Sequence, residues 1–140
     1  MSITRSRSAV VAPGCPPPAS PPAGGRGVHA ARFGRFGEAA AARWYRRTGY
    51  RILDRNWRCR EGEIDLVASR GSEVVIVEVK ARTGDRYGTG AEAVDHRKRR
   101  RLRLLALRWL EEAGPGHVDL RFDVVEVDRR GHLRVHRDCF

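Results

Sequence analysis

Residues 62–82 read GEIDLVASRGSEVVIVEVKAR, and this stretch decides the fold. Two runs of strong β-formers, residues 63–68 and 73–81, are separated by the turn residues 70–72, which predicts a β-hairpin. The second run is almost continuously apolar at its start, as is typical of a strand covered on both faces. We therefore expect residues 73–81 to form the central strand of a sheet and residues 63–68 its antiparallel neighbour.

Charged residues interrupt these two strands at positions that can meet. Because side chains alternate along a strand, Glu78 and Lys80 point to the same face, about 7 Å apart along the chain. Asp65 on the preceding strand can meet Glu78 if the register of the hairpin allows. Two carboxylates and the backbone carbonyl of Val79 offer the hard oxygen ligands that Mg²⁺ or Mn²⁺ prefers.

A plain ion pair between Glu78 and Lys80 is the alternative interpretation of this pattern. Charges in a strand that is buried on both faces are costly unless they are paired or bind a metal, which favours the metal site. A divalent cation lowers the pKa of water and neutralises charge on phosphate oxygens. Lys80 can position the attacking water or stabilise the same oxygens. The sequence thus predicts a metal-dependent phosphodiesterase with Asp65, Glu78 and Lys80 as catalytic residues.

Outward from the hairpin, the apolar pattern predicts two helices and three more strands. They are a helix over residues 31–48, a strand over 50–57, a helix over 91–113 after a Gly-rich loop at 83–90, and strands over 118–128 and 132–136. The order α-β-β-β-α-β-β predicts an α/β fold with a mixed sheet flanked by helices.

The first 28 residues differ in composition from the rest of the chain. They hold six of the seven prolines and no acidic residue. Such a stretch buries too little apolar surface to offset the entropy of ordering. We expect a disordered basic tail over residues 1–28 and a single domain over residues 29–140.

The net charge of +11, from 28 Lys and Arg against 17 Asp and Glu, favours a polyanionic partner, and nucleic acid leads that class. Five arginines lie within residues 97–103, more than a solvated helix face requires, which favours contact with a nucleic-acid backbone. Lys98 falls on the inward stripe of that helix, where a snorkelling lysine and a phosphate contact are equal alternatives. The predicted nucleic-acid contacts are Lys98, Arg82, Arg97, Arg100, Arg101, Arg58 and Arg60.

The three cysteines lie far apart and form no CxxC pair, which favours a reduced, cytoplasmic protein. No apolar run approaches the length of a membrane span, so no membrane association is expected. His132 and His136 share a strand face but lie roughly 13 Å apart, too far for one metal. Asp123 is expected to pair with an arginine, and the three tryptophans are expected to lie in the core.

The ordered set of motifs resembles a known nuclease group. An acid in the second strand and Glu-Val-Lys in the third resemble the PD-(D/E)xK superfamily, which includes restriction endonucleases and Holliday junction resolvases. More narrowly, the chain is similar to the bacterial YraN family in an ordered set of motifs: residues 37–38, 56–57, 62–65, 77–82, Lys98 and residues 121–123. Ile64 stands where the superfamily name has proline, which is not a ligand.

The resemblance implies a restriction endonuclease-like fold, with Asp65 and Glu78 as metal ligands and Lys80 as the catalytic lysine. It also implies Glu38 as an additional helix acid at the site, although the helix dipole alone can favour an acid there. The implied function is a Mg²⁺- or Mn²⁺-dependent endonuclease acting on branched or single-stranded DNA in repair or recombination, with a homodimer as a further expectation. A catalytically silent nucleic-acid-binding module and an RNA-processing nuclease are the alternatives.

Overall fold

The structure is a computed structural model, and it describes residues 25–82 and 94–140, with the backbone alone for residues 25–30. Most of the predicted tail and the predicted loop at 83–90 lie outside the described residues. The helices and strands are α1 (Gly25–Arg47), β1 (Arg51–Cys59), β2 (Gly62–Arg70), β3 (Glu73–Ala81), α2 (His96–Ala113), β4 (Asp119–Val127) and β5 (Leu133–His136). The expected order of elements is therefore confirmed.

The strands form one mixed sheet in the order β1-β2-β3-β4-β5. Neighbouring strands are antiparallel except β3 and β4, which run parallel and are joined through α2. A parallel pair needs such a crossover, because a tight turn cannot reverse the chain twice. The strand β3 lies in the centre, and its Val74, Val75, Ile76 and Val77 are all buried, as the apolar run predicts.

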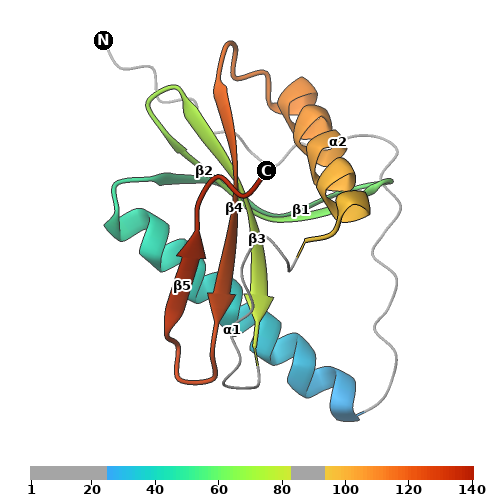
Figure 1. Cartoon of the computed structure of the whole chain (residues 1–140), viewed down its shortest axis with the longest axis vertical. Coiled ribbons are helices and arrows are strands. Elements are labelled where there is room, and N and C mark those ends of the chain that lie inside the picture. Colours follow the sequence, from blue (N-terminus) through green and yellow to red (C-terminus); the bar gives the residue numbers. More distant parts are fainter. Residues whose placement is uncertain (1–24, 83–93) are drawn as a thin grey trace.

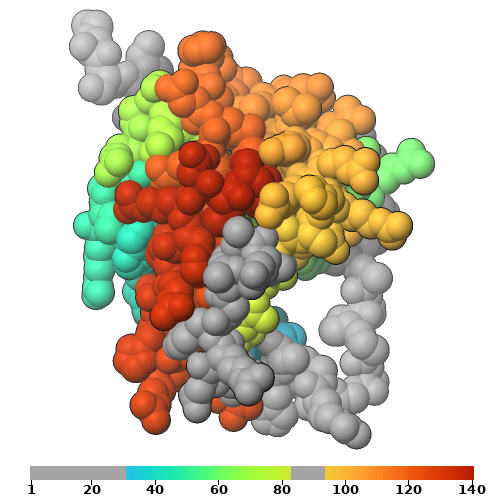
Figure 2. Space-filling model, in the orientation of Figure 1, coloured from blue at the N-terminus to red at the C-terminus, as the bar shows by residue number. Residues whose placement is uncertain are grey.

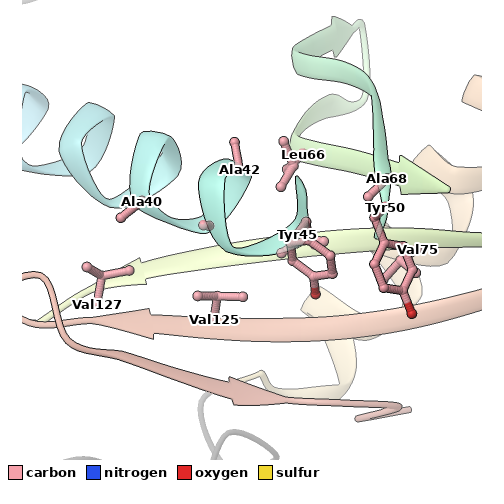
Figure 3. Close-up of a cluster of buried hydrophobic side chains, with 11 residues drawn as sticks. Ala40, Ala42, Tyr45, Tyr50, Leu66, Ala68, Val75, Val125 and Val127 are labelled. Carbon is pink, nitrogen blue, oxygen red and sulfur yellow. The ribbon is translucent and has the colours of Figure 1, made fainter. Parts of the chain in front are cut away.

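The two helices cover opposite faces of the sheet, so the fold has three layers (Figure 1). On one face, α1 packs its buried Ala40, Ala41 and Ala42 against the strands, and Tyr45 and Tyr50 complete this core (Figure 3). Small side chains let the helix approach the sheet closely. This α/β arrangement with a five-stranded mixed sheet between two helices is the expected restriction endonuclease-like architecture.

On the other face, α2 buries Leu102, Leu105, Ala106 and Trp109 in the second core. The C-terminal residues close this core from the side and lie directly beside α2 (Figure 2). The Phe140 ring stacks on Phe122 with centroids 4.9 Å apart. Trp109 is buried, and Trp44 and Trp57 are partly buried against the two cores, so the predicted core role of the tryptophans is confirmed.

The predicted starts of both helices are wrong. The helix α2 begins at His96 instead of residue 91, because the Asp95 carboxylate caps it by accepting a hydrogen bond from the Lys98 N–H at 2.8 Å. Val94 is buried as expected but precedes the helix. The helix α1 begins at Gly25 instead of residue 31. The sequence has no proline after Pro22 that would end the helix before residue 31.

The strands keep their predicted centres, and β3 has its predicted bounds. β1 and β2 are each longer than expected, because backbone pairing continues into the turn as far as Cys59 and Gly62. In the part of the chain that the structure describes, neither helix is long and apolar enough to cross a membrane.

Candidate active site

A cavity of about 750 Å³ opens between the β1–β2 hairpin and the first turns of α2. Its walls combine acidic, basic and apolar side chains: Arg58, Cys59, Gly62, Glu63, Asp65, Glu78, Asp95, Arg97, Lys98, Arg101, Leu102 and Leu105. Two of the three predicted catalytic residues, Asp65 and Glu78, therefore face the same space. The third, Lys80, lies beside them, with its Nζ 3.4 Å from Glu78 Oε1.

Asp65 lies at the point where β2 and β3 stop pairing. The backbone register of the two strands ends at Leu66 and Val77, and the next free N–H, that of Val79, donates to Asp65 Oδ2 at 2.8 Å. The Asp65 side chain thus takes the place of a backbone hydrogen-bond acceptor at the point where β2 and β3 separate. This hydrogen bond fixes the carboxylate next to Glu78 and next to the backbone of the third predicted ligand, Val79.

The facing of β2 changes next to Asp65. Ile64 packs in the α2 core and Leu66 in the α1 core, although residues two apart on a regular strand share a face. Opposite Asp65, between the pairs Arg55–Leu66 and Trp57–Ile64, Asn56 adopts a left-handed φ of 50°. Asparagine tolerates this region better than most residues. Alternation from Leu66 already points Asp65 to the α2 face, where the cavity lies, and the irregularity places Ile64 on that face as well.

Asn56 also contacts Glu38, the predicted helix acid. Its side-chain amide donates to Glu38 Oε2 at 3.0 Å, which ties α1 to the twisted part of β1. Glu38 does not line the cavity, but its charge adds to the field at Asp65. The role of Asn56 was missed from sequence, although a poor β-former inside a strand is a signal of an irregularity.

Asp65 is largely buried and lies beside a second acid, Glu78. Burial and then the neighbouring charge of Glu78 raise the pKa of Asp65 to about 7, against a smaller opposing effect of the Val79 N–H. A divalent cation between the two carboxylates would offset the repulsion between them, which is the second cause of this shift. The donor set therefore fits a hard cation such as Mg²⁺.

Protein ligands for that cation are few in the described residues. Within residues 25–82 and 94–140, no group of three or more His, Cys, Asp or Glu side chains is arranged to hold a metal ion. The predicted site thus consists of two carboxylates, Asp65 and Glu78, with the Val79 carbonyl. Mg²⁺ characteristically retains several waters in such sites, so a sparse protein shell suits it.

Glu78 is shared between the only two lysines of the chain. Lys98 Nζ hydrogen-bonds and ion-pairs with the same Oε1 atom that Lys80 approaches. Burial and the neighbouring Lys98 lower the pKa of Lys80. Burial lowers the pKa of Lys98 too, but the hydrogen bond and charge of Glu78 outweigh it, and that pKa is raised. Lys98 is thus an ion-pair partner, which neither sequence alternative had named.

The structure places some of the predicted nucleic-acid contacts in the cavity and others outside it. Arg58, Arg97, Arg101 and Lys98 line the cavity, whereas Arg100 borders a separate hollow with three other residues of α2, His96, Arg99 and Arg103. The exposed Arg60 belongs to the turn after β1 and does not line the cavity.

Arg101 anchors the β1–β2 turn to α2. Its Nε donates to the Glu61 carbonyl at 2.9 Å, and the guanidinium lies against Gly62. Gly62 has φ 150°, and a Cβ there would lie 2.8 Å from Arg101 Nη2, so only glycine fits without displacement. This contact joins two walls of the cavity.

Arg82 contacts a buried acid that the sequence analysis did not identify. This acid is Glu126 on β4, which is 0% exposed. Its carboxylate accepts a hydrogen bond from Arg82 Nε at 3.3 Å and lies 3.0 Å from His136 Nε2. Its register partner is Lys80, so this acid adjoins the site on the same sheet face. An acid inside the apolar run FDVVEV was the available signal.

Comparisons with known proteins place this chain in a family. Residues 37–127 match the model of the uncharacterised protein family UPF0102. A UPF0102 protein of Frankia casuarinae is 56% identical over 105 residues, covering 74% of this chain and 89% of the relative. One of Pelotomaculum thermopropionicum is 52% identical over 104 residues, covering 73% and 87%. One of Rhodococcus opacus is 50% identical over 100 residues, covering 71% and 85%.

The matched region contains every element that builds the cavity, from the second half of α1 to the end of β4. The YraN-type resemblance carried by the motifs at residues 37–38, 62–65 and 77–82 is confirmed by these matches. This chain belongs to the UPF0102 family, the YraN-type family of proteins.

Proposed function

We propose that this protein is a metal-dependent endonuclease that hydrolyses phosphodiester bonds of DNA, with Asp65 and Glu78 as the metal ligands. The observation that carries the proposal is the half-buried Asp65, held beside Glu78 in a cavity that arginines line. Two adjacent carboxylates are unfavourable in a structural role. They are useful where a divalent cation and a phosphate must be bound together.

Each site residue has a role that follows from its position. Asp65 and Glu78, with the Val79 carbonyl, would hold Mg²⁺ or Mn²⁺, which when bound activates water and neutralises charge on the phosphate. Lys80 Nζ, on the same strand face as Glu78, is placed to donate to a phosphate oxygen. Its lowered pKa also lets Nζ release a proton more readily than an ordinary lysine.

The remaining residues of the proposed site act on position and binding. Glu38, through Asn56, would support the irregular part of β1 that lies opposite Asp65. Arg58, Arg97 and Arg101 supply positive charge around the two acids and suit the phosphates that flank the scissile one. Phosphate contacts carry no sequence information, so the proposed nuclease would depend on substrate shape more than on base sequence.

The test is incubation of purified protein with plasmid, single-stranded and four-way-junction DNA and with RNA, with Mn²⁺ or with EDTA. We expect Mn²⁺-dependent cleavage of at least one DNA substrate and none in EDTA. Cleavage of RNA but not DNA would favour the RNA-processing alternative. If every substrate stays intact but is retarded in a gel, the protein is a binding module and the nuclease proposal is wrong.

Arg97→Ala is expected to weaken DNA binding by about threefold to tenfold, because one phosphate contact is lost. The slope of log Kd against log salt should fall by about one. Fluorescence anisotropy at several salt concentrations measures both. Arg47→Ala is the matched control, since Arg47 is exposed at the end of α1, on the other side of the sheet. Equal effects of the two substitutions would mean that binding depends on net charge and not on the cavity.

A further inference from the structure

The chain's only two lysines meet at one carboxylate oxygen. Of 28 basic residues, 26 are arginine, and the exceptions are Lys80 and Lys98. They come from different elements, β3 and α2, yet both place Nζ at Glu78 Oε1. Lysine offers a compact ammonium on a flexible stem, whereas arginine offers a rigid planar fork. The residue type at both positions thus suits a cation that occupies a small space and can leave it.

The backbone of Lys98 is fixed while its side chain can move. Asp95 caps α2 and holds the Lys98 N–H at 2.8 Å, so the helix positions the Cα. The side chain is 36% exposed and lines the cavity, whereas that of Glu78 is only 11% exposed. Movement of Lys98 Nζ into the cavity therefore requires rotations of the side chain alone and no change of the fold.

The charges at this point balance without a metal. Asp65 and Glu78 together contribute two negative charges when ionised, and Lys80 and Lys98 contribute two positive charges. A divalent cation bound by both carboxylates would compete with Lys98 for Glu78 Oε1, since both need the same lone pairs. With the cation present, the site would carry a surplus of two positive charges, which suits an entering phosphodiester.

We propose that Lys98 is an internal counter-ion of the metal site, which holds Glu78 until a divalent cation displaces it and then contacts a phosphate of the substrate. This inference rests on the proposed function, because it needs the metal and the phosphate. It gives Lys98 a role different from that of Lys80, which stays on the strand beside the two acids. It also accounts for a lysine in a helix whose other basic residues, apart from His96, are all arginine.

The first test is a Mn²⁺ titration of wild type, Lys98→Met, Lys98→Arg and Arg103→Met, followed by electron paramagnetic resonance of free Mn²⁺. Removal of the competing charge is expected to make Lys98→Met bind Mn²⁺ about tenfold more tightly than wild type. Lys98→Arg, which keeps the charge, should bind Mn²⁺ no more tightly than wild type. Arg103→Met removes a charge from an exposed position of the same helix, outside the cavity, and should also match wild type.

The second test measures the phosphate contact through binding of a phosphorothioate-linked DNA oligonucleotide that resists cleavage. Mn²⁺ is expected to raise the affinity of wild type for the oligonucleotide. In Mn²⁺, Lys98→Met should bind the oligonucleotide about tenfold more weakly than wild type, whereas in EDTA the two affinities should differ little. A merely structural lysine would affect both conditions alike.

The outcomes separate this inference from the proposed function. If Lys98→Met binds Mn²⁺ no more tightly than wild type, or if no form binds Mn²⁺, the counter-ion role is wrong. If the metal effect appears but the oligonucleotide effect does not, the phosphate contact is wrong. If both effects appear and wild type cleaves nothing, the inference stands and the nuclease proposal fails.

Discussion

Asp65→Asn is expected to abolish metal-dependent cleavage and, at the same time, to stabilise the metal-free protein at pH 8. The amide cannot supply the negative charge that holds a divalent cation, so we expect cleavage to fall by roughly a thousandfold or more. Its side-chain oxygen can still accept from the Val79 N–H, which Asp65 Oδ2 now does at 2.8 Å. The fold should therefore keep the hydrogen bond and lose only the unfavourable charge.

The gain in stability depends on pH in a defined direction. Burial and the charge of Glu78 raise the pKa of Asp65 to about 7 from its ordinary value of 3.8. Well below pH 3.8 the Asp65 carboxyl is protonated in both the folded and the unfolded chain and costs nothing. Between about pH 4 and 7 only the unfolded chain has released the proton, so wild type loses stability as pH rises, by roughly 2 to 4 kcal/mol in total.

Thermal unfolding in EDTA at pH 5 and pH 8 measures this difference. Asp65→Asn should have the higher Tm at pH 8, with a smaller advantage at pH 5, where wild-type Asp65 is still mostly protonated. Addition of Mg²⁺ should raise the Tm of wild type but not of Asp65→Asn. Asp119→Asn, at an exposed carboxylate on β4, is the control and should change little. A lower Tm of Asp65→Asn at pH 8 would show that the ionised carboxylate stabilises the fold.

The parts of the site that local sequence rules govern were predictable. The bounds of β3 followed from an uninterrupted apolar run between a turn and a charged end. The shared face of Glu78 and Lys80 followed from strand alternation. The contact between Asp65 and Glu78 required only that the hairpin be antiparallel with a short turn. All three inferences depend on residues within the same twenty positions.

The parts that depend on distant packing were not predictable. The partner of Lys98 is set by how α2 crosses from β3 to β4, which no local pattern encodes. The facing change at Ile64 accompanies a left-handed residue on another strand, Asn56, and the alternation rule does not predict either. The start of α2 was wrong for a different reason, since the capping residue Asp95 was present in the sequence and was overlooked.

Loss of Asp123 is expected to be the most damaging single change to stability among the polar residues. Asp123 is 1% exposed and accepts from Tyr45 Oη at 2.6 Å and from Arg121 Nε and Nη2, both at 2.9 Å. The prediction that it pairs with an arginine is therefore confirmed. It also accepts from the Asp138 N–H at 3.0 Å, which holds the C-terminal residues in place.

The network extends from Asp123 to Tyr50, the residue before β1, and to Glu73 on β3. Arg121 Nη1 pairs with Glu73 Oε1 at 2.6 Å, and Tyr50 Oη donates to Glu73 Oε2 at 2.8 Å. Each buried polar atom in it has a partner, and no buried side-chain N or O atom in the described residues lacks one. Burial, then the charge and hydrogen bond of Asp123, raise the pKa of Tyr45, so the hydroxyl stays protonated and donates.

Asp123→Ala should cost about 3 to 5 kcal/mol, because it leaves the Arg121 charge and the Tyr45 hydroxyl buried without this acceptor. Tyr45→Phe removes one donor to a charged acceptor and should cost only about 1.5 to 3 kcal/mol. Urea unfolding of the two variants measures the free energies. Equal costs would mean that Asp123 contributes nothing beyond its bond to Tyr45.

The double variant Arg121→Met with Asp123→Leu separates pairing from burial. Replacing both charges by apolar groups removes the desolvation of the ions together with their attraction, so the double variant should lose less stability than the two single changes summed. Glu73, where the network ends, lies five residues before Glu78 on β3, roughly 16 Å away along the strand. The folded fraction of each variant should therefore keep the wild-type affinity for Mn²⁺. A fall in that affinity in the double variant would instead mean that the network at one end of β3 positions the acids at the other.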